Sequence, residues 1–159
     1  MKPHHGEIKE LSSSESTDLL ARNQFGHLAC HVKDDIFLVP ISYIYEDGYI
    51  YSHSQDGKKV HMMRKNPRVC VQVEEVGDFF HWKSVLAWGD FEELKSEDAM
   101  IAMRNIVKKL SLGEERRSEL ELYFESQLES AVIYRIKVDR ITGRYENGFS
   151  NFAEQSLTP

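Results

Sequence analysis

The sequence contains none of the short motifs that by themselves identify a catalytic centre. Its 159 residues include no GxSxG nucleophile elbow, no Walker phosphate-binding loop and no GxGxxG dinucleotide fingerprint. Its seven histidines show neither the HExxH spacing nor an HxH pair beside a carboxylate, so we expect no metal site. If the chain catalyses a reaction, the reactive atoms should therefore belong to a bound cofactor.

Cysteines are scarce and long apolar runs are absent. Cys30 and Cys70 lie in apolar segments without a CxxC pairing, which indicates buried reduced thiols, with a disulfide between them as the alternative. The first ten residues, MKPHHGEIKE, lack the apolar core of a signal peptide, and no stretch is long enough to cross a bilayer. These absences predict a cytoplasmic protein that does not associate with membranes.

Positive charge is not in excess either. The formal net charge is −6, which argues against a general binder of nucleic acid or of anionic membranes, so any anion site must be local. The chain is long enough for one hydrophobic core but not for two independent ones. We therefore expect a single domain over residues 1–159.

What the sequence does contain is a series of short apolar strands separated by turn residues. Hairpin turns are predicted at Asp34–Asp35 and at Asp47–Gly48, and Gly89 indicates a bulge or a bend within a long strand. The predicted strands are 25–32, 36–45, 49–53, one that begins at residue 69, 79–94 and 131–141. The predicted helices are 12–23, 57–66, 96–110 and 114–128. This order predicts a mainly β (α+β) domain, a closed or partly closed antiparallel barrel with peripheral helices.

The segment 36–45 is apolar on both faces, so its outer face should be covered, for which a partner chain is a candidate. The same segment contains Pro40, which cannot donate a hydrogen bond to a sheet. Pro40 thus marks an interruption, where the backbone groups of Val39, Ile41 and Ser42 are free to bind a flat heteroaromatic ring. An ordinary edge strand is the alternative.

The stretch YSHSQDGKKVHMMRKNPRV joins the end of a strand to the start of a basic helix. Ser54 or Asp56 can cap this helix, and Lys58 and Lys59 lie in its first turn. Unpaired N–H groups and the helix dipole favour an anion there. The pattern predicts a phosphate site, and a solvated basic turn is the alternative. His53 should lie near this site and could donate a hydrogen bond or a proton to a substrate, unless it is only a polar residue at a strand end.

Taken together, these segments resemble the pyridoxamine 5′-phosphate oxidase-like flavoproteins, most closely the branch that contains nitroimidazole-resistance proteins. The resemblance rests on the order and spacing of VPISY, YIYSHS, GKK, NPRVCVQV, KSVLAWGDFEEL and RITGR, and it covers about residues 7–144. It implies a Greek-key split β-barrel and a homodimer that binds FMN in two equivalent clefts at the dimer interface. Residues 145–159 lack periodicity and are expected to form a tail, either loose or lying over a neighbouring subunit.

The resemblance also implies roles for individual residues. In that family the proline-containing strand runs along the isoalloxazine ring, the next strand flanks the flavin, and the lysine pair holds its phosphate. A polar side chain from the long strand also reaches the cofactor. The cofactor-binding residues implied here are Val39, Pro40, Ile41, Ser42, Ser52, His53, Lys58, Lys59 and Ser84, with His53 as the catalytic residue.

The expected activity is FMN-dependent oxidoreduction, in which NADH or NADPH reduces the flavin and the flavin reduces a small acceptor, for example a nitroaromatic compound. His53 would position the acceptor or deliver a proton. True pyridoxamine 5′-phosphate oxidases carry a C-terminal tryptophan and an Arg-Leu-His-Asp-Arg type segment. This chain reads DRITGRYENGFSNF there, so that reaction is not expected, although Arg140 and Arg144 could meet an anionic ligand. The alternative is a split barrel that carries a flavin or haem without turnover.

Overall fold

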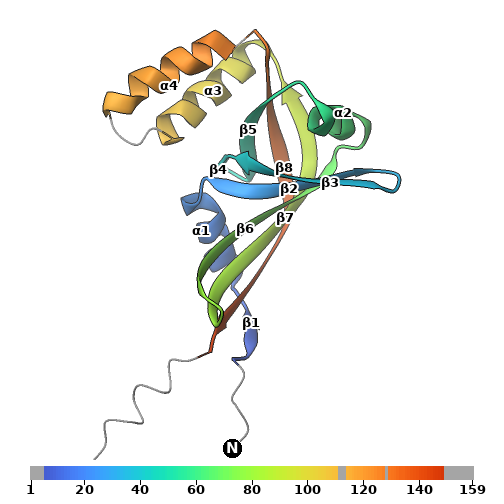
Figure 1. Cartoon of the computed structure of the whole chain (residues 1–159), viewed down its shortest axis with the longest axis vertical. Coiled ribbons are helices and arrows are strands. Elements are labelled where there is room, and N and C mark those ends of the chain that lie inside the picture. Colours follow the sequence, from blue (N-terminus) through green and yellow to red (C-terminus); the bar gives the residue numbers. More distant parts are fainter. Residues whose placement is uncertain (1–5, 111–113, 128, 149–159) are drawn as a thin grey trace, which may run out of the picture.

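Antiparallel β-sheet dominates the computed structural model, which describes residues 6–110, 114–127 and 129–148 (Figure 1). The strands are β1 (Ile8–Glu10), β2 (Phe25–Val32), β3 (Asp35–Ser42), β4 (Ile44–Glu46), β5 (Tyr49–Gln55), β6 (Arg68–Asp78), β7 (His81–Leu94) and β8 (Ala131–Asn147). The helices are α1 (Ser13–Arg22), α2 (Lys58–Lys65), α3 (Ser96–Leu110) and α4 (Glu114–Gln127). The predicted mainly β fold with peripheral helices is confirmed. Within these described ranges, no helix is both long enough and apolar enough to span a bilayer.

The sheet has the strand order β3-β2-β6-β7-β8-β5-β4, with β1 added to β8. Every strand pair is antiparallel, and β8 separates β5 from the β6–β7 hairpin, which is the Greek-key arrangement. The sheet curls so that its end strand β3 approaches β5 without pairing to it. A hydrogen bond spans this gap, from the Ser52 hydroxyl to the Ser42 carbonyl at 2.7 Å. We call the gap the β3–β5 seam, and it makes the predicted barrel a split one.

Two hydrophobic clusters hold the helices against this sheet. Alternate residues of the strands, those whose side chains point inward, form the first cluster, and α1 adds Leu19 and Leu20, both completely buried. Burying each leucine contributes about 1.5–3 kcal/mol, so α1 is held mainly by this packing. The second cluster lies beneath α3 and α4 and includes Phe124 and Ile133. Figure 1 shows these two helices side by side over one end of the sheet.

The strand predicted at 36–45 is two strands, and the break lies at Tyr43 rather than at Pro40. Tyr43 is completely buried, and its hydroxyl donates to the Leu20 carbonyl at 2.7 Å. This anchor turns the chain inward between β3 and β4. Pro40 instead stays in register with His27. Because β3 is an edge strand and the proline nitrogen faces the open edge, the missing N–H removes no hydrogen bond to β2.

The predicted irregularity at Gly89 is confirmed. The β7–β8 register shifts between Trp88 and Gly89, and a Cβ atom at residue 89 would lie only 2.2 Å from the Lys137 carbonyl oxygen. A side chain would therefore prevent the strands from approaching at this bulge.

The last strand extends further than its local pattern predicted. It reaches Asn147, which pairs with His81, because β7 and β1 cover its two edges. Residues 145–147, expected to belong to a tail, are therefore part of the sheet. The rest of the expected tail, 149–159, and residue 128 of the predicted fourth helix lie outside the described residues.

Candidate functional site

The site begins at the N-terminus of α2, which no side chain caps. The N-cap residue is Gly57, whose backbone is extended and which makes no side-chain cap hydrogen bond. The predicted caps are wrong. Ser54 donates its hydroxyl to the carbonyl of the next residue, and Asp56 directs its carboxylate to Arg64 at 3.1 Å. The N–H groups of the first turn consequently lack an internal acceptor and can bind an anion.

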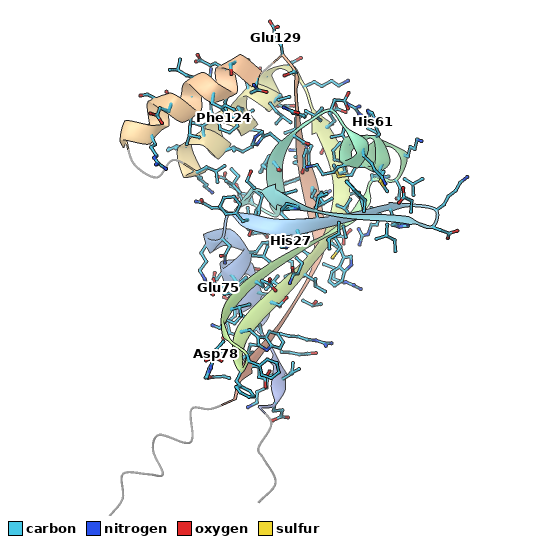
Figure 2. All side chains as sticks on the ribbon, viewed as in Figure 1. His27, His61, Glu75, Asp78, Phe124 and Glu129 are labelled. Atoms are coloured by element: carbon cyan, nitrogen blue, oxygen red, sulfur yellow. The ribbon has the colours of Figure 1, made fainter. Side chains whose placement is uncertain are left out.

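An ion pair and two buried side chains hold α2 in place. Val60 and Met63 are completely buried, while Arg64 makes hydrogen bonds of 2.9 and 2.8 Å to the carboxylate of Glu93 on β7. The hydrogen bonds from Arg64 hold the pKa of Glu93 below its ordinary value. Figure 2 labels His61 on this helix, beside the end of the barrel. These contacts direct the uncapped end of α2 toward the β3–β5 seam.

The two lysines of the first turn diverge to different strands. The Lys58 ammonium lies 3.1 Å from Asp35 and 4.8 Å from the ring centroid of Phe37 on β3. The half-buried Lys59 ammonium lies 6.0 Å from the ring centroid of Tyr134 on β8. Burial lowers the pKa of Lys59, an effect that the nearby Cys30 partly opposes. The first turn of α2 thus carries two ammonium groups, which can form charge-assisted hydrogen bonds with a phosphate.

The free edge of β3 presents different backbone groups from those predicted. The Tyr43 N–H donates to the Gln24 carbonyl at 2.8 Å, and hydrogen-bonded pairs alternate along an antiparallel ladder. The backbone polar groups of Val39 and Ile41 therefore point toward β2. The prediction that they are free is wrong.

Alternate residues of β3 face the seam instead. By the same alternation, the backbone groups of Leu38, Pro40 and Ser42 point toward the open edge. The Ser42 carbonyl already accepts the Ser52 hydroxyl, so the seam retains the carbonyls of Leu38 and Pro40 and the N–H groups of Leu38 and Ser42. Sequence reasoning missed Leu38, which the edge position of β3 would have identified.

His53 lies on β5 under the helical hairpin. Its ring meets the ring of Phe124 edge to face, with a centroid separation of 4.8 Å. Its Nδ1 atom is buried and has no hydrogen-bond partner among the described residues. Burial, and secondarily the charge of Lys59, lowers the pKa of His53, so the imidazole is neutral at neutral pH. A buried polar atom without a partner costs about 1–3 kcal/mol, which a ligand that bonds to it would recover.

A second buried polar atom lies next to the same strand. The hydroxyl of Tyr134 also has no hydrogen-bond partner among the described residues. Tyr134 lies opposite Ser52 on the neighbouring strand β5, and the Ser52 hydroxyl donates to the Ser42 carbonyl instead. Burial raises the pKa of Tyr134 to about 12, so it remains protonated and can act as a donor.

The structure separates Ser84 from the seam. Ser84 lies on the outward face of β7, opposite Arg144, and accepts a 3.3 Å hydrogen bond from Gln72. It lines an outer hollow of about 660 Å³ together with Trp88 and Arg140, whose guanidinium lies 3.6 Å from the Trp88 ring centroid. The other predicted site residues gather around the seam, and Ser84 does not lie with them.

The outward face of the sheet is apolar where β3 and β2 continue into β6 and β7. The pairing register aligns Leu38, Ala29, Cys70 and Trp88 across these four strands. Leu38 is 63% exposed. We call this row, together with the exposed Phe25 and Ile36, the outer face. Patches of this kind on a protein surface mark interaction sites.

No three potential metal ligands among histidine, cysteine, aspartate and glutamate come together in the described ranges. Cys30 and Cys70 are free thiols. Binding at the seam would therefore depend on lysine ammonium groups, backbone groups and the imidazole.

Known proteins share both the sequence pattern and the fold. A family model described as pyridoxamine 5′-phosphate oxidase matches residues 12–145. An uncharacterized protein of Rhizobium meliloti (strain 1021) is 33% identical over 87 residues, which are 55% of this chain and 58% of that relative. The chain therefore matches less than two thirds of that relative's length.

Solved structures extend this likeness to nearly the whole fold. The crystal structure of an FAD-binding protein from Mesorhizobium loti is 32% identical and has a TM-score of 0.70, over 88% of this chain and 99% of the other. A Bacteroides thetaiotaomicron protein, named for resistance to 5-nitroimidazole antibiotics, is 16% identical with a TM-score of 0.67, over 87% of this chain and 89% of that one. The second likeness concerns the fold alone.

Proposed function

Since this chain belongs to the pyridoxamine 5′-phosphate oxidase family, we propose that it is a flavin-dependent oxidoreductase that binds FMN at the β3–β5 seam. The observation that carries the proposal is the uncapped start of α2, where Lys58 and Lys59 approach the seam from two sides. The 32% identity to a protein named as FAD-binding supports a flavin as the ligand. The lysine pair at the start of α2 suits one phosphate group, which favours FMN.

The residues at the seam suit the separate parts of this cofactor. Lys58, Lys59 and the first-turn N–H groups would hold the phosphate through charge-assisted hydrogen bonds. The strand Val39–Ser42 would run along the ring, with the carbonyls of Leu38 and Pro40 accepting hydrogen bonds from it. Ser52 and His53 would flank it from β5, and the buried Nδ1 of His53 offers an unused hydrogen-bonding atom.

The bound flavin would pass two electrons from NADH or NADPH to a small acceptor. We propose a nitroaromatic acceptor, which the sequence resemblance and the name of the Bacteroides protein suggest. The neutral imidazole of His53 would orient the acceptor by a hydrogen bond. It carries no additional proton at neutral pH, so a positioning function is favoured over proton delivery.

A second copy of the chain would complete the site. We propose that the outer face packs against its counterpart in a homodimer, because Ile36, Phe25 and Leu38 expose 75%, 73% and 63% of their surface there. A dimer could also bring Ser84 and the outer hollow of one protomer to the seam of its partner. Arg140 and Arg144 line that hollow and would be available to an anionic group.

The proposal predicts that the lysine pair recognises a phosphate rather than a ring. Replacing both lysines (K58Q/K59Q) should weaken FMN binding by about 2–4 kcal/mol, the contribution of two charge-assisted contacts at a partly exposed site. Riboflavin has no phosphate, so its affinity should not change. Quenching of flavin fluorescence during titration of flavin-free protein measures both affinities. The matched control is Lys65→Gln at the opposite end of α2.

Protein loaded with FMN then tests turnover. Anaerobic addition of NADH or NADPH should bleach the flavin absorbance, and a nitroimidazole should restore it. Bound FMN that stays oxidised would favour the alternative of a flavin carrier. Equal loss of FMN and riboflavin affinity in the lysine variant would contradict the phosphate assignment, and no binding of either compound would refute the flavin site.

A further inference from the structure

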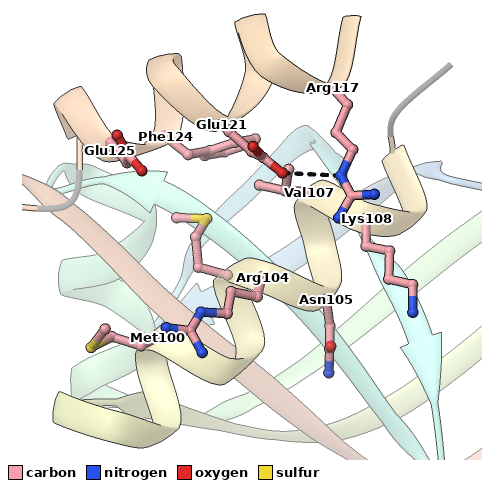
Figure 3. Close-up of a pocket in the computed structure, with 10 residues that line it drawn as sticks. Met100, Arg104, Asn105, Val107, Lys108, Arg117, Glu121, Phe124 and Glu125 are labelled. Carbon is pink, nitrogen blue, oxygen red and sulfur yellow. Dashed lines mark hydrogen bonds and ion pairs between the residues drawn. The ribbon is translucent and has the colours of Figure 1, made fainter. Parts of the chain in front are cut away.

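A pocket separate from the seam lies between α3 and α4. It has a volume of about 400 Å³, within the range of small-molecule sites. Met100, Met103 and Val107 from α3 and Phe124 from α4 line it (Figure 3). The two helices pack on β5 and β8 through the second hydrophobic cluster, so a rigid layer supports the pocket from below.

The walls of this pocket suit an aromatic ring. Methionine thioethers adapt to flat ligands and make favourable contacts at ring edges, and an aromatic side chain adds offset or edge-to-face stacking. Met100 is 49% exposed although it is one of the largest apolar residues of α3. A bound ring would cover this thioether, which α4 leaves open.

Charged groups are distributed unevenly around the pocket. Arg104 lines it and forms no hydrogen bond or ion pair with any described residue. Arg117 is already paired with Glu121 at 3.0 Å. Figure 3 shows Glu125 at one end of the pocket, with Lys108 and Arg117 at the other. An acidic ligand would therefore direct its charge toward Arg104 and away from Glu125.

We infer that the α3–α4 pocket binds a small aromatic carboxylate, with its ring between the methionines and Phe124 and its carboxylate on Arg104. Phe124 also makes the edge-to-face contact with His53, so one side chain of the pocket contacts a residue of β5. The inference does not depend on flavin binding, because the lining residues include neither Lys58 nor Lys59 nor any residue of β3.

Methionine methyl NMR tests this assignment on the full chain. Titration of [methyl-13C]methionine-labelled protein with 2-naphthoate should produce saturable shifts of the Met100 and Met103 signals. Met62 and Met63 lie in the barrel core and should not respond. The His53 ring signals should shift as well, because the probe contacts Phe124. The uncharged analogue 2-naphthamide should bind about tenfold more weakly, as expected for loss of one charge-assisted hydrogen bond.

Substitutions separate charge recognition from apolar adsorption. Arg104→Gln should weaken 2-naphthoate binding about tenfold and leave 2-naphthamide binding unchanged. The control Arg116→Gln removes an exposed charge from α4 outside the lining and should have no effect. Thermal unfolding checks that both variants are folded. The inference is overturned by equal affinities for the two probes, by an unaffected Arg104 variant, or by absence of saturable shifts.

Two further outcomes would assign the pocket to another occupant. Met100 and Met103 signals that move with protein concentration alone would indicate that a second copy fills the pocket. Signals that move when residues 149–159 are deleted would indicate that the chain's own C-terminal segment fills it. Either result overturns the small-molecule assignment. Flavin binding at the seam can succeed or fail in each case, so the two proposals are tested separately.

Discussion

At the scale of single residues, His53 shows how burial changes the function of a side chain. An exposed histidine at a strand end would titrate near its ordinary pKa and could supply a proton at neutral pH. Here the Phe124 ring covers it and the Lys59 charge lies close by, and both disfavour the imidazolium. The same burial leaves Nδ1 without a partner. The residue is therefore suited to accept or donate one directed hydrogen bond.

The lowered pKa of His53 predicts how stability depends on pH. The unfolded chain protonates His53 near its ordinary pKa of about 6.5, before the folded protein does, so this residue reduces stability as pH falls below that value. The variant His53→Gln should lose less unfolding free energy than the wild type between about pH 7.5 and pH 5.5. Urea denaturation at several pH values measures this difference.

The control for that measurement is His27→Gln, which changes an exposed histidine on the outward side of β2. Comparison with this variant separates the effect of the surroundings of His53 from the effect of removing a histidine. Identical pH profiles for the wild type and the His53 variant would show that Phe124 and Lys59 do not disfavour the imidazolium.

At the scale of secondary-structure elements, the bulge of β7 allows one long strand to serve two parts of the molecule. Before the bulge β7 carries Ser84 and Trp88 on the outer face, and after it Glu93 anchors α2 through Arg64. The change of register at Gly89 requires close contact between the backbones of β7 and β8. The element therefore depends on the absence of a side chain at this position.

Gly89→Ala should destabilise the protein by about 2–3 kcal/mol or prevent folding, because the added methyl group would overlap the Lys137 carbonyl oxygen. Urea or thermal unfolding measures the loss. The matched control is Gly57→Ala, since nothing lies within 4 Å of a Cβ there and its φ of −166° is open to any residue. A loss of the same size in both variants would contradict a steric origin at the bulge.

At the scale of the whole molecule, one chain keeps the seam and the outer hollow on separate surfaces. Ser84, Arg140 and Arg144 lie on the outward face of β7 and β8, whereas the lysine pair lies at the seam. The apolar outer face between these regions is exposed on one chain. Dimerisation would bury this face and could bring the two regions together.

Leu38→Glu should convert the proposed dimer to a monomer, because a carboxylate on the outer face would be buried there without a partner. Light scattering coupled to size-exclusion chromatography measures the mass. FMN affinity should fall in the same variant if the partner contributes to the site. Leu122→Glu on α4, where the leucine is 67% exposed, is the control and should leave the mass unchanged. A monomeric wild type would refute the dimer.

Much of the fold could be predicted from local patterns, and the errors have specific causes. The alternation of residues 69–74 and the turn at Asp47–Gly48 correctly indicated strands and a hairpin. The cap predicted for α2 does not form, because Arg64, eight residues away, takes the carboxylate of Asp56. The break was placed at Pro40 because the sequence does not show which strand lies at the edge of the sheet. The sequence pattern of neither helix indicates the α3–α4 pocket, because residues of both helices line it.

The sequence by itself determined most of the strands, the turns, the bulge and the basic start of α2, because periodicity, turn residues and charge act between near neighbours. Only the tertiary structure decided which backbone groups of β3 face the seam and that Phe124 covers His53. It also decided that Ser84 lies apart from the other predicted site residues. These features depend on strand register and on packing between residues far apart in the chain, which no local pattern specifies.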